Sequence, residues 1–352
     1  MVSIRCFVFL LCISSAVILW GFSAPQGKKL PVESQTIRVN VEMVSLPVVV
    51  TTQDGRRITN LKREDFEVYE NGVKQEIAGF GATDEPLEIV LLLDTSGSTE
   101  AKLAKIQNAA IDFVHHLHPD DEVAILSFAD DTTLQQDFSI DRDKNAYGIK
   151  KTRPGGSTVV YEAVWLALEE VLKPIKERKA LVIFTDGVDT RSSKASEKET
   201  LELAKETRAT IYCVYYDTEG DQYRRRTTVG GYPTQTIPPI LNPLPPIIVG
   251  SGSGSDPFEY KQGREYLDKL AEYSGGLVFD GMTDLRAAFA NVARELASQY
   301  SIGYYSNNSK NDGKFRKVEV KVNKSGMVAR TKKGYYAPKN PQDTKDNKGK
   351  KK

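Results

Sequence analysis

Oxygen-bearing side chains gather where an apolar stretch of the sequence ends, in EIVLLLDTSGSTE (88–100). Asp94 follows five apolar residues, and Ser96 and Ser98 come after it at alternate positions. The stretch contains neither histidine nor cysteine. Carboxylate and hydroxyl oxygens are the ligands that hard divalent cations such as Mg²⁺ prefer. These residue types therefore predict a cation site at the end of a buried strand.

Nucleophilic catalysis and phosphate binding fit this stretch less well. A serine nucleophile needs a base within hydrogen-bond reach. The three histidines, His115, His116 and His118, lie at the far end of the helix predicted after the serines, about 25–30 Å away at 1.5 Å per residue. The stretch also lacks the lysine and the further glycines of a phosphate-binding loop. We therefore predict that the protein is not an enzyme.

Two later segments carry similar side chains. RPGGSTVV (153–160) contains Ser157 and Thr158 before a predicted helix, and FTDGVDT (184–190) contains Asp186 directly after a predicted strand. Open α/β sheets bind their ligands at the carboxyl ends of the strands. We therefore expect both segments to lie at the same sheet edge as Asp94.

The elements that must position these loops alternate between strand and helix from about Pro86 to Ser298. Predicted strands are EIVLLLD, EVAILSFA, KALVIFTDG, ATIYCVYYD and GLVFD, with amphipathic helices between them, the first at 99–117 and the last at 283–298. Ser196 and Glu199 predict a capping box at the start of one helix. Apolar strands that alternate with helices indicate a doubly wound, Rossmann-like α/β domain with a mostly parallel sheet, placed at 85–298.

The segments on either side have β character. In the N-terminal β segment (36–84), Asn71-Gly72 between short strands predicts a hairpin. The C-terminal β segment (299–337) offers three candidate strands, QYSIGYYSN, FRKVEVKVN and GMVARTKKGYY. Neither segment has enough strands to be stable alone. We predict that both fold together into one small β-sandwich, into which the α/β domain is inserted.

Three segments are predicted to lie outside these domains. Residues 1–24 have one basic residue, a long apolar run and small residues after it, which indicates a signal peptide or an uncleaved membrane anchor. Residues 219–257 are rich in Pro and Gly and are expected to form a flexible loop insertion. Residues 338–352 are expected to form a disordered, lysine-rich tail. The protein is therefore expected to be secreted, periplasmic or at the cell surface.

The charge balance limits the choice of partner. The chain has 48 Lys and Arg against 47 Asp and Glu, a net charge of +1, which argues against nucleic acid and against an anionic membrane surface. Membrane contact is expected only through the N-terminal anchor, if it is retained. Cys213 is the one cysteine after the signal, so no internal disulfide is expected. The sequence leaves the oligomeric state open.

Three motifs in order resemble a von Willebrand factor type A (VWFA) domain. They are D-x-S-x-S at 94–98, the threonine at 158 before a helix, and T-D-G at 185–187. Together they are similar to the metal-ion-dependent adhesion site of that family. The flanks, with DFEVYENG before and QYSIGYY, FRKVEV and KGYY after, resemble VWFA-related proteins of acidobacteria.

The resemblance implies roles for individual residues. The metal ligands would be Asp94, Ser96, Ser98, Thr158 and Asp186, with Ser157 as an alternative donor beside Thr158. The implied metal is Mg²⁺, or Mn²⁺ or Ca²⁺, and the remaining coordination position would take a Glu or Asp carboxylate of a protein ligand. The implied function is that of an exported, metal-dependent, adhesion-type module. The alternative is a structural or assembly scaffold in which the metal only stabilises the fold.

Overall fold

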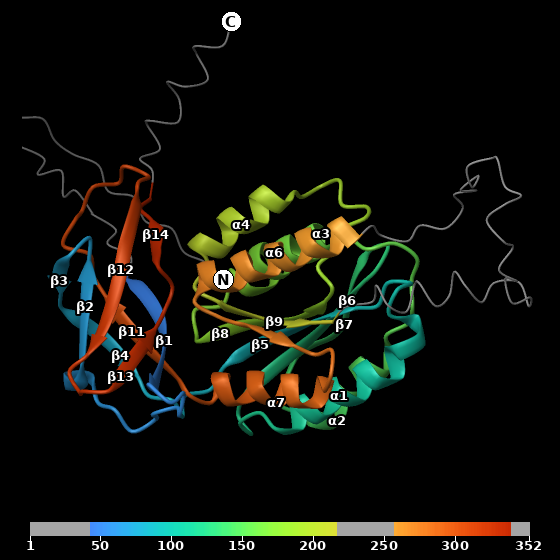
Figure 1. Cartoon of the computed structure of the whole chain (residues 1–352), viewed down its shortest axis with the longest axis horizontal. Coiled ribbons are helices and arrows are strands. Elements are labelled where there is room, and N and C mark those ends of the chain that lie inside the picture. Colours follow the sequence, from blue (N-terminus) through green and yellow to red (C-terminus); the bar gives the residue numbers. More distant parts are fainter. Residues whose placement is uncertain (1–42, 217–256, 339–352) are drawn as a thin grey trace, which may run out of the picture. The chain divides into compact units, whose positions relative to one another are not determined.

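The computed structural model describes residues 43–216 and 257–338 (Figure 1). The predicted signal peptide or anchor at 1–24 lies outside these residues. So do the predicted loop at 219–257 and the predicted tail at 338–352, except for one residue of each. Within the described residues, no helix combines the length and the apolar character needed to cross a membrane.

A six-stranded sheet lies at the centre of the α/β part, in the order β10-β9-β8-β5-β6-β7. Its strands are β5 (Glu88–Asp94), β6 (Glu122–Phe128), β7 (Thr132–Ser139), β8 (Lys179–Thr185), β9 (Thr210–Tyr215) and β10 (Val278–Asp280). Five strands run parallel, and β7 pairs antiparallel with β6 at one edge. The long apolar runs of β5 and β8 are buried almost throughout, because helices cover both faces of a parallel sheet.

Helices form a layer on each face of this sheet (Figure 1). They are α1 (Leu103–His115), α2 (Arg142–Lys151), α3 (Val160–Leu166), α4 (Glu197–Glu206), α6 (Pro257–Ser274) and α7 (Leu285–Leu296), with the short helices η2 (Glu100–Lys102) before α1 and η3 (Ala167–Leu172) after α3. Helices α1, α2 and α7 share one core with the sheet, and α3, α4 and α6 share the other. The predicted doubly wound α/β fold is confirmed.

Two elements of this part were not predicted. Strand β7 is largely accessible at the sheet edge, so its residues do not form an apolar run. Helix α2 is mostly polar, although Ala146 and Ile149 are buried. The predicted capping box is confirmed, since Ser196 Oγ accepts the Glu199 N–H at 3.4 Å and Glu199 Oε2 accepts the Ser196 N–H at 2.9 Å.

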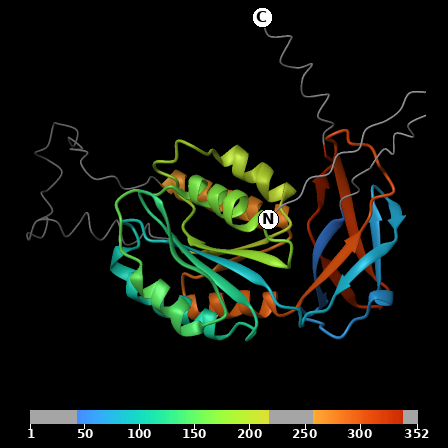
Figure 2. The same ribbon diagram turned by 180° about the vertical axis from the view of Figure 1, so that it is seen from behind.

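The flanking β segments form two four-stranded sheets, ordered β13-β1-β11-β4 and β14-β12-β2-β3. The strands are β1 (Val44–Thr52), β2 (Phe66–Glu70), β3 (Val73–Gln75), β4 (Ile77–Gly81), β11 (Gln299–Tyr304), β12 (Phe315–Val322), β13 (Met327–Arg330) and β14 (Gly334–Tyr336), with a short helix η1 (Arg63–Asp65) before β2. We call strands β1–β4 and β11–β14 the two-sheet unit. Blue strands from before the α/β part lie beside orange and red strands from after it (Figure 2).

The pairing of the two β segments agrees with the prediction. Strand β1 pairs antiparallel with β11 and β13, and β2 pairs with β12. Val48, Val68 and Ile302 from different strands lie in one common core. The Asn71-Gly72 hairpin joins β2 to β3, and both residues have positive φ, as this turn requires. The predicted single strand GMVARTKKGYY was wrong, because it forms β13 and β14 in different sheets.

The chain enters and leaves the α/β part at paired residues. Gly81 at the end of β4 pairs with Ser301 of β11. Arg178 donates to the carbonyl oxygens of Ala82 and Gln299, which lie on the two connecting segments. All of these residues belong to one compact unit that begins at Val41.

Candidate metal centre

Asp94 ends strand β5 and is fully buried. Its Oδ1 accepts the Ser96 N–H at 2.9 Å, and its Oδ2 accepts the Thr185 hydroxyl at 2.7 Å. Burial raises the pKa of the Asp94 carboxyl above its usual value, while hydrogen bonds from Ser96 and Thr185 oppose this rise. Among the described residues, no Lys or Arg contributes to this balance. A buried carboxylate without a counter-charge is costly, so this environment favours a cation.

Two hydroxyls converge beside Asp94. The Oγ atoms of Ser96 and Ser98 are 3.1 Å apart. Ser96 is buried and Ser98 half-buried. Thr99 fixes the turn between them and α1 by donating its hydroxyl to the Ser96 carbonyl at 2.8 Å. The loop therefore holds a carboxylate and two hydroxyls in close reach of one another.

The loop before α3 is bonded to this loop through its backbone. Gly155 N–H donates to the Thr95 carbonyl at 2.8 Å, and Gly97 N–H donates to the Gly156 carbonyl at 3.3 Å. A Cβ atom at Gly97 would lie 3.2 Å from the Gly156 oxygen, which is too close for easy accommodation. The glycine of D-x-S-x-S therefore lets the two loops approach each other closely.

The structure distinguishes the two candidate hydroxyls of this second loop. The Ser157 hydroxyl lies close enough to the Asp130 carboxylate to help lower its pKa. Thr158 is buried, and its backbone is held by Thr190, whose hydroxyl accepts the Thr158 N–H at 2.9 Å. No hydrogen bond of the Thr158 hydroxyl is seen among the described residues. This arrangement favours Thr158 over Ser157 as an oxygen donor.

Asp186 begins the loop after β8 and is also buried. Its Oδ1 accepts the Val188 N–H at 3.0 Å. Gly187 has a φ of +78°, and a Cβ atom there would lie 2.5 Å from the carbonyl oxygen of Gly263 in α6. Only glycine fits such a position. A backbone contact with α6 thus holds the Asp186 loop in place.

Asp130, at the end of β6, was missed from the sequence. Its Oδ2 accepts the Gly156 N–H at 3.0 Å, and its Oδ1 accepts the Ser157 N–H at 3.0 Å and Arg191 Nη1 at 3.1 Å. The N–H groups of Gly156 and Ser157, then the Ser157 hydroxyl, lower the pKa of Asp130 to about 2. Its place after a parallel strand is the signal that would have found it.

Thr185 was also missed as a functional residue, although it is the threonine of T-D-G. Its hydroxyl donates to Asp94 and accepts the Gly187 N–H at 3.0 Å. It therefore connects the first and third predicted segments directly. The hydrogen bonds of Thr190 to Thr158 connect the second and third.

The residues present fit a hard divalent cation. Among the described residues, no group of three or more His, Cys, Asp or Glu could hold a metal ion. The predicted donors, on loops that are joined by hydrogen bonds, instead combine two buried carboxylates with hydroxyls. Oxygen-only donors suit Mg²⁺, Mn²⁺ or Ca²⁺ better than zinc or copper.

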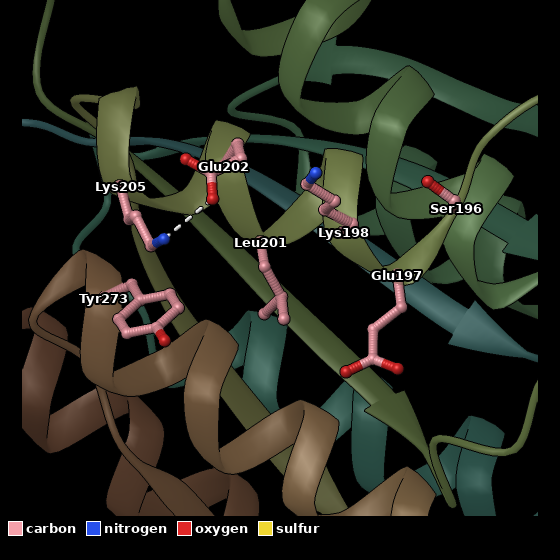
Figure 3. Close-up of a pocket in the computed structure, with 7 residues that line it drawn as sticks. All are labelled: Ser196, Glu197, Lys198, Leu201, Glu202, Lys205 and Tyr273. Atoms are coloured by element: carbon pink, nitrogen blue, oxygen red, sulfur yellow. Dashed lines mark hydrogen bonds and ion pairs between the residues drawn. The ribbon is translucent and has the colours of Figure 1, made fainter.

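A pocket of about 400 Å³ lies elsewhere, between α4 and α6 (Figure 3). It is lined by Ser196, Glu197, Lys198, Leu201, Glu202, Lys205 and Tyr273. Three of its charged groups are in ion pairs: Lys205 with Glu202 at 2.8 Å, and Glu197 with Lys269 at 3.5 Å. None of the predicted metal ligands lines it. The carboxyl edge of the six-stranded sheet therefore remains the candidate site.

Comparison with known protein families finds a match within the α/β part. Residues 89–188 match the family model described as "von Willebrand factor type A domain". This interval contains all five predicted metal ligands. A search of curated protein sequences finds no match.

The solved structures that match this chain have low sequence identity to it. The conserved hypothetical protein BatB from Bacteroides thetaiotaomicron is 16% identical, with a TM-score of 0.41 over 60% of this chain and 97% of that one. Proximal thread matrix protein 1 from the mussel byssus, with a zinc-occupied MIDAS motif, is 18% identical, with a TM-score of 0.42 over 64% of this chain and 49% of that one. A von Willebrand factor type A structure from Catenulispora acidiphila is 14% identical, with a TM-score of 0.42 over 79% of this chain and 74% of that one.

Proposed function

This chain carries a von Willebrand factor type A domain, and on that premise we propose that it is an exported, metal-dependent protein-binding module. The observation that carries the proposal is the buried carboxylate of Asp94 beside the two hydroxyls of Ser96 and Ser98. Asp94 has no cationic partner among the described residues. Thr158 and Asp186 lie on loops that are hydrogen-bonded to this one or to each other.

Each residue has a defined part in the proposed site. Ser96, Ser98 and Thr158 would hold the metal through hydroxyl oxygens, and Asp94 and Asp186 through carboxylates. A bound divalent ion would supply an electrophilic position for a Glu or Asp carboxylate of a protein partner. The low negative charge of the donor set supports this role. Two carboxylates neutralise a divalent ion without adding an excess of negative charge that would repel the carboxylate of a partner.

A binding role is favoured over a catalytic one by the surroundings of the serines. The hydroxyls of Ser96 and Ser98 face each other, and a nucleophile would need a base in that position. The histidines of the described chain lie at the other end of α1, a helix of 13 residues that is itself about 20 Å long at 1.5 Å per residue. Export is supported by the N-terminal sequence, with its apolar run after Arg5.

Titration calorimetry with Mg²⁺ and Mn²⁺ tests the metal site. We expect saturable binding to the parent, and loss of that binding in Asp94→Asn and Ser96→Ala. Ser325→Ala makes the same chemical change at an exposed turn of the two-sheet unit and should leave binding unchanged. Equal binding by the parent and by both site variants would show that the metal, if bound, lies elsewhere.

The scaffold alternative is favoured by one observation. The three loops are already joined by hydrogen bonds between protein atoms, including Thr185 to Asp94 and Thr190 to Thr158. In this second candidate the metal only stiffens loops that the fold has positioned. Thermal unfolding with Mg²⁺, compared with binding of acidic peptides, separates the two. Stabilisation by Mg²⁺ without any peptide binding would favour the scaffold.

A further inference from the structure

A basic side chain lies at the rim of the proposed metal site. The backbone N–H of Arg191 donates to the carbonyl of Thr158 at 3.2 Å, so its position is fixed to a predicted ligand. Its guanidinium extends to Asp130, with Nη1 3.1 Å from Oδ1. Asp130 in turn accepts the N–H groups of Gly156 and Ser157. The guanidinium therefore lies beside the backbone that leads directly into Thr158.

The carboxylates around Arg191 point inward, toward backbone N–H groups. Asp130 accepts two of them, as described above. Asp189 accepts the N–H groups of Tyr161 at 3.1 Å and Ser192 at 2.9 Å. Glu162 accepts those of Ser193 at 2.6 Å and Lys194 at 2.8 Å. These three carboxylates hold the loop in place by accepting hydrogen bonds from its backbone N–H groups.

The basic residues of the same loop point outward. The side chain of Arg191 is 62% exposed, and that of Lys194 is 81% exposed. A guanidinium has five N–H donors, and one of its nitrogens contacts Asp130 in the described structure. The other guanidinium donors have no hydrogen-bond partner among the described residues and can serve a ligand. Arg is suited to a second carboxylate, because its planar fork matches the two oxygens.

We propose that Arg191 is a second anchor for the partner, and that the partner is a protein segment with two neighbouring acidic side chains. One carboxylate would occupy the metal site and the other would bind the Arg191 guanidinium. This inference rests on the proposed function. It adds that the protein recognises two acidic residues of its partner and not one. The spacing between these two residues would then determine which partners bind.

Peptide binding in the presence of Mg²⁺ tests the proposal. The probes are end-blocked, fluorescently labelled Gly-Gly-Asp-Gly-Asp-Gly-Gly and the two versions in which one Asp is replaced by Asn, measured by fluorescence anisotropy. The parent should bind the doubly acidic peptide about tenfold more tightly than either single-acid peptide, the size expected for one charge-assisted contact. Arg191→Gln should remove this preference while still binding the single-acid peptides.

Controls separate the inference from its premise. Lys194→Gln removes an exposed cation of the same loop and should keep most of the preference. Calorimetry should show that Mg²⁺ affinity is unchanged in Arg191→Gln. The proposal is wrong if the parent shows no preference, if Lys194→Gln loses it equally, or if Arg191→Gln also loses Mg²⁺. If Mg²⁺ binds but no peptide binds the parent, carboxylate capture itself is wrong, and the inference fails with it.

Discussion

Among the carboxylates that are buried in the described residues, Glu70 and Asp94 have different surroundings. Glu70 in the two-sheet unit is buried and accepts three hydroxyls: Tyr304 at 2.9 Å, Tyr335 at 2.8 Å and Ser306 at 2.8 Å. Asp94 in the α/β part accepts a backbone N–H and a hydroxyl from neighbouring loops at the sheet edge. Burial of an acid is therefore not in itself a sign of a metal site.

The difference lies in the donors. The partners of Glu70 come from distant parts of the chain and include two phenols, and burial raises the pKa of Tyr335 to about 12. Such donors join strands of the two sheets. The hydroxyls near Asp94 are those of serine and threonine, which can also donate oxygen to a cation. We infer that Glu70 stabilises the fold, whereas Asp94 binds an exchangeable cation. This contrast can be tested.

The largest effect is expected from Glu70→Leu, which removes the acceptor of three buried hydroxyls. The free energy of unfolding should fall by about 3 kcal/mol or more. Urea denaturation measures it, with Glu319→Leu at an exposed position of β12 as the control. Mg²⁺ affinity should not change at conditions where the variant is folded. A large loss of Mg²⁺ affinity would mean that the two carboxylates are not independent.

Asp94→Asn should give the opposite pattern. Mg²⁺ at 100 times its Kd should stabilise the parent by about 2.7 kcal/mol and the variant not at all. In the absence of metal the variant should be only about 1 kcal/mol less stable, because the amide removes a buried charge but leaves either the Ser96 N–H or the Thr185 hydroxyl without its acceptor. Thermal unfolding with and without Mg²⁺ measures both quantities. Strong destabilisation of the metal-free variant would place Asp94 in the same class as Glu70.

Lys332 gives the two-sheet unit a pH response of its own. Burial, then the nearby positive charge of Arg208, lowers the pKa of Lys332 to about 8. Between pH 8 and its unfolded pKa of about 10.4, the unfolded state holds the proton that the folded state has lost, so stability rises with pH. We expect a gain of about 2 kcal/mol from pH 7.5 to 9.5.

Lys332→Met is the control for this prediction. Other groups titrate in this range, so the measured quantity is the difference between the parent and the variant in urea midpoints across the pH series. The gain should be present in the parent and reduced in the variant. Identical pH profiles would show that the Lys332 ammonium is not the source.

The smallest effect is expected on Mg²⁺ affinity when the neighbouring hydroxyls of Thr158 and Ser157 are removed in turn. Thr158→Val should lower Mg²⁺ affinity about tenfold, a loss of about 1.4 kcal/mol, because it removes a proposed ligand while keeping the shape of the side chain. Ser157→Ala should lower it no more than about twofold, since the Ser157 hydroxyl lies near the Asp130 carboxylate and Asp130 is not a predicted metal ligand. Calorimetry on both variants decides the assignment. The reverse order would make Ser157 the ligand.

Strong local patterns allowed much of the fold to be predicted from the sequence. The apolar runs of β5 and β8, the Asn71-Gly72 turn and the Ser196 capping box each specify one structure. Strand β7 and helix α2 were missed because both are largely polar at the edge of the sheet. The break between β13 and β14 was missed because the residues between them, 331–333, include neither glycine nor proline to mark the end of a strand.

The candidate site was predictable only as far as residue types allow. Asp94, Ser96 and Asp186 follow strands, and the sequence rule for strand ends placed them at one edge. The supporting residues Asp130, Thr185 and Arg191 act through hydrogen bonds to segments far away in the chain. Such bonds depend on which strands are neighbours in the sheet. No single sequence motif specifies the order β8-β5-β6, so these residues could not be predicted.

The double connection between the α/β part and the two-sheet unit determines how mechanical load passes through the molecule. Gly81 and Ser301, from which the two crossings start, are paired on adjacent strands, and Arg178 contacts both connecting segments. A single linker lets a domain swivel, whereas two crossings bridged by one side chain resist torsion. Torsion applied through a bound partner would therefore act on both connections at once.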